Sequence, residues 1–271
     1  MGIGLPALPR PGALQPSPPV PNSSSAPSSP VLPIHVHADR VARVLTTVLL
    51  ALLSANVAIV YVQWSYGYFH PLSGLTNLFL LGSEANLPTY FSSGCLLTAA
   101  LCLGLIARGC TDGLRWYWWV LCGGFLFLSL DEAAQLHETI LSTAAQHLLG
   151  KFKFPGFRQL WVPLALLIFA FAVPVGVRFI RRLPRWYAGR FFFCGALYVF
   201  AAVGLEVAEG VMTVRKVDPV WLVFTVLVEE SLETLAIICF IHALLRYLAH
   251  QNLRVQLTFA APASAAGSPG P

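Results

Sequence analysis

Apolar residues along this chain are gathered into long runs separated by short polar segments. Each run has about 20 residues, which as a helix rising ~1.5 Å per residue crosses the roughly 30 Å hydrocarbon core of a bilayer. Backbone groups in lipid must hydrogen-bond within their own segment, so the runs predict helices rather than strands. The expected spans are residues 41–63, 90–107, 114–131, 159–177, 191–212 and 219–245.

The pattern predicts an all-α fold, a polytopic bundle of six transmembrane helices over residues 39–248. Only 11% of the residues are charged, against roughly 25% in a soluble domain. The segment LFLLGSEANLPTYFSS is too short and too interrupted to span, and we expect a re-entrant or interfacial segment before the second span.

The two ends of the chain differ from the bundle in composition. Residues 1–38, rich in Pro, Ser and Ala, and residues 249–271 are expected to be disordered tails. The N-terminal stretch is broken by proline and lacks the pattern of a cleaved signal, so the first span is expected to remain as an anchor.

The distribution of Lys and Arg predicts the orientation. With the N-terminus inside, twelve basic residues lie on the inner side and five on the outer side, and short cytoplasmic loops are the ones that collect Lys and Arg. Both termini are therefore expected in the cytoplasm, in a multipass protein of the cell (inner) membrane. The densest cluster, VRFIRRLPRWYAGR, indicates topology and contact with anionic headgroups, and no nucleic-acid partner is expected.

Most of the acidic residues lie towards the outer side of the membrane in this predicted topology. Nine of the twelve fall in, or at the outer edge of, an apolar segment: Glu84, Asp131, Glu132, Glu138, Glu206, Glu209, Glu229, Glu230 and Glu233. A carboxylate at the centre of a membrane helix costs about 2.5–3.5 kcal/mol on insertion scales, and intramembrane ionisable residues are functional by default. We therefore expect one shared site in the outer leaflet.

Helical spacing places several of these acids on common faces. Glu206 and Glu209 are three residues apart, as are Glu230 and Glu233, and Glu229 is four residues from Glu233. In the stretch SLDEAAQLHE, a regular helix would align Asp131 with Gln135 and Glu138, and would turn His137 away from Glu138.

Carboxylate-rich sites favour Mg²⁺, Mn²⁺, Ca²⁺ or iron, so a divalent metal ion is the expected cofactor, if any. The expected ligands are Glu84, Glu132, His137, Glu206, Glu209, Glu229, Glu230 and Glu233. Asp131 and Glu138 are the expected catalytic residues, as a ligand or a general base. Glu-x-x-His does not occur in the sequence, which disfavours an ordinary ferritin-like di-iron site.

The motifs NLPTYFSS, SLDEAAQLHE and EESLE resemble, as a set, an uncharacterised group of bacterial multipass membrane proteins, over about residues 40–245. This resemblance implies no known activity.

Three functions remain open from the sequence. The first is a metal-dependent enzyme acting on a lipid or lipid-linked substrate taken from the bilayer. The second is a proton- or cation-coupled transporter or channel, disfavoured because the inner halves of the last two spans offer few polar groups beyond Tyr198 and His242. The third is a non-catalytic scaffold or sensor with a structural cation.

Overall fold

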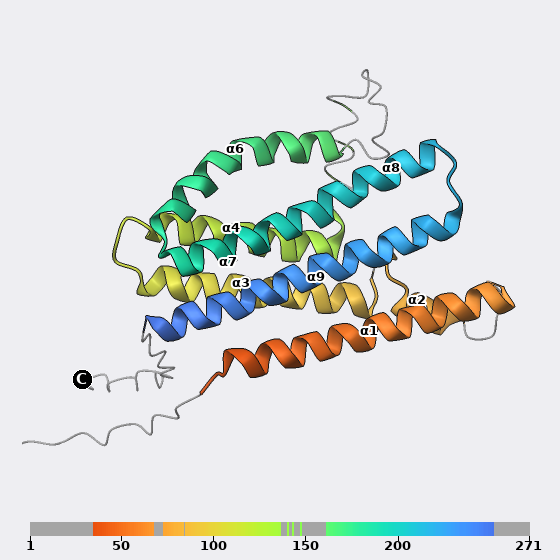
Figure 1. The fold of residues 1–271 in the computed structure, drawn as a ribbon, viewed down its shortest axis with the longest axis horizontal. Helices are drawn as coiled ribbons and strands as arrows, with labels where there is room; N and C mark the ends of the chain where they lie inside the picture. The colour runs from red at the N-terminus through yellow and green to blue at the C-terminus, as the bar shows by residue number, and fades with distance from the viewer. Residues whose placement is uncertain are drawn as a thin grey trace, which may run out of the picture. The chain divides into compact units, whose positions relative to one another are not determined.

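The apolar runs fold into helices, and no strand occurs in the part of the chain that this computed structural model describes (Figure 1). The structure describes residues 35–67, 73–83, 85–136 and 161–251, with the isolated residues 140, 143 and 147. All of these belong to one structural unit, His35–Val255. The expected tails fall almost wholly outside the described residues, and they stay predictions.

The helices, in chain order, are α1 Ala38–Tyr66, α2 Ser73–Phe79, α3 Leu87–Gly109, α4 Arg115–Ala134, α6 Trp161–Arg182, α7 Arg185–Val199, the π-helix η2 Phe200–Leu205, α8 Glu206–Val214 and α9 Pro219–His250. Among the described residues, three helical segments are long and apolar enough to cross a membrane: Ala38–Tyr66, Leu87–Gly109 and Arg185–Val214. This all-helical, apolar architecture indicates a membrane protein. The segment expected before the second span contains the end of α2, a turn and the start of α3.

Local hydrogen bonds fix where α3 and α9 begin. The Thr89 N–H donates to the side-chain oxygen of Asn86 at 3.0 Å, and the Asn86 amide donates to the Leu80 and Ser83 carbonyls at 2.7 and 2.6 Å. The Val220 N–H donates to the Asp218 carboxylate at 2.9 Å, directly before Pro219. Both are helix N-caps, which satisfy N–H groups that have no partner within the helix.

Helix α9 is the central element of the packing. It packs against α1, α3, α7 and η2, while α3 pairs with α4 (Figure 1). The turn between α2 and α3 also approaches α9 closely. Gly82 has a φ of +76°, and a Cβ atom there would lie 2.7 Å from Val226 Cγ1, so both the backbone conformation and the close approach require glycine.

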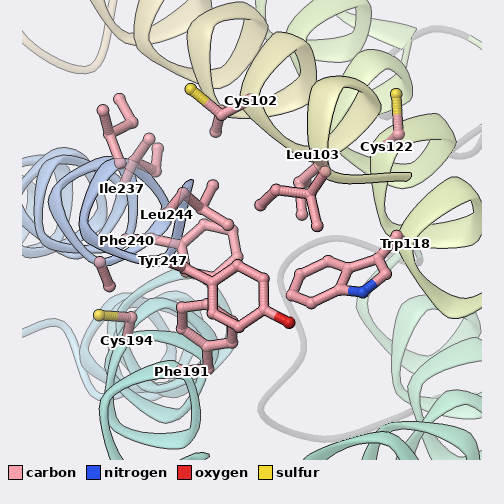
Figure 2. Close-up of a cluster of buried hydrophobic side chains, with 14 of the residues drawn as sticks. Cys102, Leu103, Trp118, Cys122, Phe191, Cys194, Ile237, Phe240, Leu244 and Tyr247 are labelled. Carbon is pink, nitrogen blue, oxygen red and sulfur yellow. The ribbon is translucent and has the colours of Figure 1, made fainter. Parts of the chain in front are cut away.

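The buried apolar core occupies the half of the bundle where α3 and α9 end and α4 and α7 begin. Trp118 stands edge-on to Phe179, with ring centroids 4.8 Å apart, and lies 5.2 Å from the ring of Tyr247. Figure 2 shows Trp118, Phe191, Phe240 and Tyr247 gathered between these helices. The acidic residues described below lie away from this core, at the end of α4, in the first half of α9 and in α8, which follows α7 and η2.

Candidate functional site

A π-helix precedes the acidic residues of α8. The helical segment that begins with α7 widens over Phe200–Leu205 and returns to α-helix at Glu206. Within it Gly204 lies against the ring of Phe200, where a Cβ atom would be 3.3 Å from the nearest ring carbon. π-Helices are rare and are frequent at functional sites. Here η2 directly precedes Glu206, the first residue of α8.

We call Glu206 and Glu209 of α8 and Glu229 of α9 the acidic triad. One carboxylate oxygen from each residue lies within 4.8 Å of the other two. Glu209 is only 7% exposed, and its carboxyl is hydrogen-bonded to that of Glu229. Oxygen ligands lie about 2.0–2.6 Å from Mg²⁺ or Ca²⁺, so two ligands of one ion are at most about 4–5 Å apart. The separation of the triad oxygens is therefore compatible with ligands of one divalent cation.

A second acidic group continues from the triad along α9 towards α4. Glu233 lies close enough to Glu230, Glu132 and Glu206 to interact electrostatically with all three. The phenol of Tyr198, from the end of α7, interacts in the same way with Glu233, Glu132, Asp131 and Glu230. The carboxylates of α4, α8 and α9 therefore face one another across a single region.

Hydroxyl groups of α3 hold the acidic end of α4 in place. The Ser92 hydroxyl donates a hydrogen bond to Glu132 Oε1. One turn earlier on α4, the Ser93 hydroxyl donates to the Ser129 carbonyl at 2.8 Å, and the Ser129 hydroxyl donates to the Ser93 carbonyl at 2.9 Å. These bonds fix the register of α3 against α4 and orient Glu132 towards α9.

The structure gathers seven of the residues selected from the sequence. These are Asp131, Glu132, Glu206, Glu209, Glu229, Glu230 and Glu233. The other three, Glu84, His137 and Glu138, lie outside the described residues. The roles assigned to all ten as ligands or catalytic groups stay predictions.

The regular helix assumed for SLDEAAQLHE is interrupted at Gln135. Helix α4 ends at Ala134, and Gln135 adopts a left-handed conformation with φ 56°, its N–H donating to the Asp131 carbonyl. A left-handed residue changes the direction of the chain at a helix C-terminus. The expected alignment of Gln135 with Asp131 on a regular helical face was therefore wrong, and the expected place of Glu138 on that face lies outside the described residues.

Two residues of this region, Ser92 and Tyr198, were not selected from the sequence. Ser92 lies in the motif NLPTYFSS, and Tyr198 is a polar group in an apolar helix. Both features were visible in the sequence. The sequence does not show how α3 packs on α4, nor the widened turn of η2, and these features give the two residues their acidic neighbours.

Comparison with known proteins gives one match. A family model described as "Domain of unknown function (DUF8692)" matches residues 42–248, a range that includes the whole of the acidic region described above. No curated protein and no solved structure matches the chain.

Proposed function

We propose that this chain, which belongs to the family described as "Domain of unknown function (DUF8692)", is a membrane-embedded enzyme that depends on a divalent metal ion and acts on a lipid or lipid-linked substrate. The observation that supports this most strongly is the acidic triad, with carboxylate oxygens from two helices within 4.8 Å of one another. When they are ionised, carboxylates held so close in an apolar surrounding repel one another, and a bound cation, in place of the proton of the Glu209–Glu229 hydrogen bond, relieves that repulsion.

The proposed roles follow from the chemistry of the donors. Glu206, Glu209 and Glu229 would hold the ion, and the all-oxygen donor set suits Mg²⁺, Mn²⁺, Ca²⁺ or iron. When bound, such an ion polarises a substrate oxygen or lowers the pKa of a water molecule. Asp131, beside Tyr198 in the second acidic group, is the proposed general base.

The membrane arrangement is part of the proposal. Helices α4, α6 and α9 have 20, 22 and 32 residues, which at about 1.5 Å per residue is enough to cross the bilayer beside the three apolar segments. With six spans and both termini in the cytoplasm, the acidic region lies in the outer leaflet of the cell (inner) membrane. A lipid substrate would reach it laterally, between helices.

Cation- or proton-coupled transport is the second candidate. Few polar groups lie beyond the acidic region along α7 and α9, but one contact that the sequence does not predict, between His242 of α9 and Asp39 of α1, favours it. Tyr198 is next to Glu233, and nearer the far end of α9 the His242 Nε2 atom lies 2.8 Å from Asp39 Oδ1. Ionisable groups in membrane helices commonly mark ion or proton routes.

The test of the proposed enzyme is a search for lipid turnover. Purified protein in nanodiscs containing a bacterial polar lipid extract is incubated with Mg²⁺, Mn²⁺, Ca²⁺ or Fe²⁺, and the lipids are analysed by mass spectrometry. We expect a metal-dependent product that Glu229→Gln abolishes, and a rate that Asp131→Asn lowers about 100-fold or more because a general base contributes that much.

Asp112→Asn is the matched control for this experiment. Asp112 lies in the loop between α3 and α4, at the other end of the bundle, and the hydrogen bonds from the Cys110 thiol and the Leu114 N–H lower the pKa of its carboxyl. The control therefore removes a genuine negative charge without touching the acidic region. If the protein carried cations or protons across proteoliposomes in a metal-dependent way and turned over no lipid, it would be a transporter and not an enzyme. If it bound stoichiometric metal but showed neither activity, it would be a scaffold or sensor.

A further inference from the structure

A cavity of about 570 Å³ opens at the end of the bundle opposite the acidic region, between α1, α7 and α9. Its polar wall is formed by Asp39, Arg43, Arg190 and His242, and its apolar wall includes Phe193 and Ile238. The cavity shares no residue with the acidic triad. A site of this composition suits an amphipathic ligand with a charged end.

The charge around the cavity is positive. The His242 ring and the Asp39 carboxylate are already paired, with Nε2 and Oδ1 2.8 Å apart. Arg43 and Arg190 line the cavity, and Arg246 is close enough to Asp39 to interact with it. The cavity thus has two lining guanidinium groups, Arg43 and Arg190, beside a carboxylate that His242 and Arg246 already engage. Guanidinium groups match the geometry of phosphate oxygens.

Arg190 is held in position for a ligand at the membrane surface. Its guanidinium carbon lies 4.3 Å from the centre of the Trp186 ring, and Trp186 is 66% exposed. Stacking on an aromatic ring orients an arginine, and exposed tryptophan is typical of the level of lipid headgroups. On the other side, the Arg43 Nε–H donates to the Asp39 carbonyl at 3.3 Å, which fixes the direction of that side chain along α1.

A second cavity, of about 600 Å³, lies further along α1 and α9. It is lined mainly by apolar side chains, among them Leu53, Val57, Val228 and Leu232. On α1 the lining residues of the two cavities are at positions 39, 42, 43, 46, 50, 53, 54 and 57. This is the repeat of three and four positions that places residues on one helix face.

The length of this face fits one leaflet. Thr46, which lines the first cavity, and Val57, which lines the second, are eleven positions apart, or about 17 Å along a helix. Half of a roughly 30 Å hydrocarbon core is about 15 Å. A lipid whose headgroup lies in the first cavity therefore has an acyl-chain length of apolar seam available between α1 and α9.

We propose that the seam between α1 and α9 binds one anionic phospholipid, with its phosphate on Arg43 and Arg190 and an acyl chain along Leu53, Val57 and Val228. A cluster of arginines without a cavity would be explained by membrane orientation, with no need for a bound lipid. The convergence of two arginines on a cavity that leads to an apolar groove points to a specific lipid. This site is independent of the proposed enzymatic function.

The test is native mass spectrometry of the full-length protein titrated with dioleoyl phosphatidylglycerol or dioleoyl phosphatidylcholine. We expect saturable binding of one phosphatidylglycerol. Arg43→Gln and Arg190→Gln should each weaken it about tenfold, because each removes a charge-assisted contact to phosphate. Val57→Trp should weaken binding of the dioleoyl lipid by filling the groove. Arg181→Gln, a change at an exposed arginine of α6 that does not line the cavity, is the control and should bind as the wild type does.

Two further measurements distinguish lipid binding from binding of other anions, and loss of a contact from misfolding of the variant. Glycerol phosphate at the same concentration should neither bind nor compete; equal competition would show a free-phosphate site and overturn the proposal. Arg190→Lys keeps the charge and loses the paired geometry, so binding between that of the wild type and Arg190→Gln is expected. Equal binding of both lipids, or equal loss in Arg181→Gln and Arg190→Gln, would also overturn it.

Discussion

Trp118 shows how single residues hold the core that supports the acidic region. Its side chain is fully buried and contacts the rings of Phe179, Phe191 and Tyr247, at centroid distances of 4.8, 6.0 and 5.2 Å. Its indole N–H has no hydrogen-bond partner in the part of the chain that the structure describes. An unsatisfied buried donor costs about 1–3 kcal/mol, so packing of the ring must outweigh that cost.

Replacing Trp118 by alanine should therefore lower the free energy of unfolding by about 3–5 kcal/mol, the usual loss for a large buried aromatic ring. Trp118→Phe should cost clearly less, because it keeps an aromatic ring and removes the unsatisfied N–H. Reversible unfolding in mixed detergent micelles, followed by circular dichroism, measures both. If Trp118→Ala were as stable as the wild type, the proposed role of this core would be wrong.

At the scale of helices, the sequence predicted those features that depend only on local pattern. Long apolar runs predict helices, and the three-residue spacing of Glu206 and Glu209 predicts a shared face because α8 is a regular α-helix. The π-helix before it was not predictable, since counting 100° per residue fails where hydrogen bonds shift to i→i+5. The bond from Ser92 to Glu132 was also invisible, since it depends on how α3 packs against α4.

The turn between α2 and α3 gives a test at this scale. Asn86 is 6% exposed; it caps α3 through Thr89 and donates to the carbonyls of Leu80 and Ser83. Asn86→Ala should lower the free energy of unfolding by about 2 kcal/mol, since it removes both the cap and the buried amide bonds.

Ser54→Ala is the comparison variant for Asn86→Ala. The Ser54 hydroxyl donates to the Leu50 carbonyl of its own helix, and removing such a bond at an exposed position should change the unfolding free energy by less than about 0.5 kcal/mol. The same unfolding titration measures both variants. Equal stability of Asn86→Ala and Ser54→Ala would show that the turn does not depend on Asn86.

In the part of the chain that the structure describes, one set of helices carries the buried apolar core in one half and the acidic region in the other. In α9, the buried residues from Ala236 to Tyr247 belong to the core, whereas Glu229, Glu230 and Glu233 lie one to two turns earlier. A well-packed core at one end holds the helices in fixed positions, and so keeps the carboxylates of α8 and α9 close together at the other. A cation that binds only this folded arrangement would stabilise the whole protein by mass action.

The most direct test of the central claim is equilibrium titration of the purified, metal-free protein with Mn²⁺, followed by calorimetry and by the melting temperature. The wild type should bind one ion, with a stabilisation of about 2.7 kcal/mol at 100 times the dissociation constant. Glu209→Gln and Glu229→Gln should each weaken binding at least about tenfold, and Asp112→Asn should bind as the wild type does. Saturable binding that is equally strong in Glu209→Gln, Glu229→Gln and the wild type, or no saturable binding of Mn²⁺, Mg²⁺, Ca²⁺ or Fe²⁺ to the wild type, would contradict the proposed metal site.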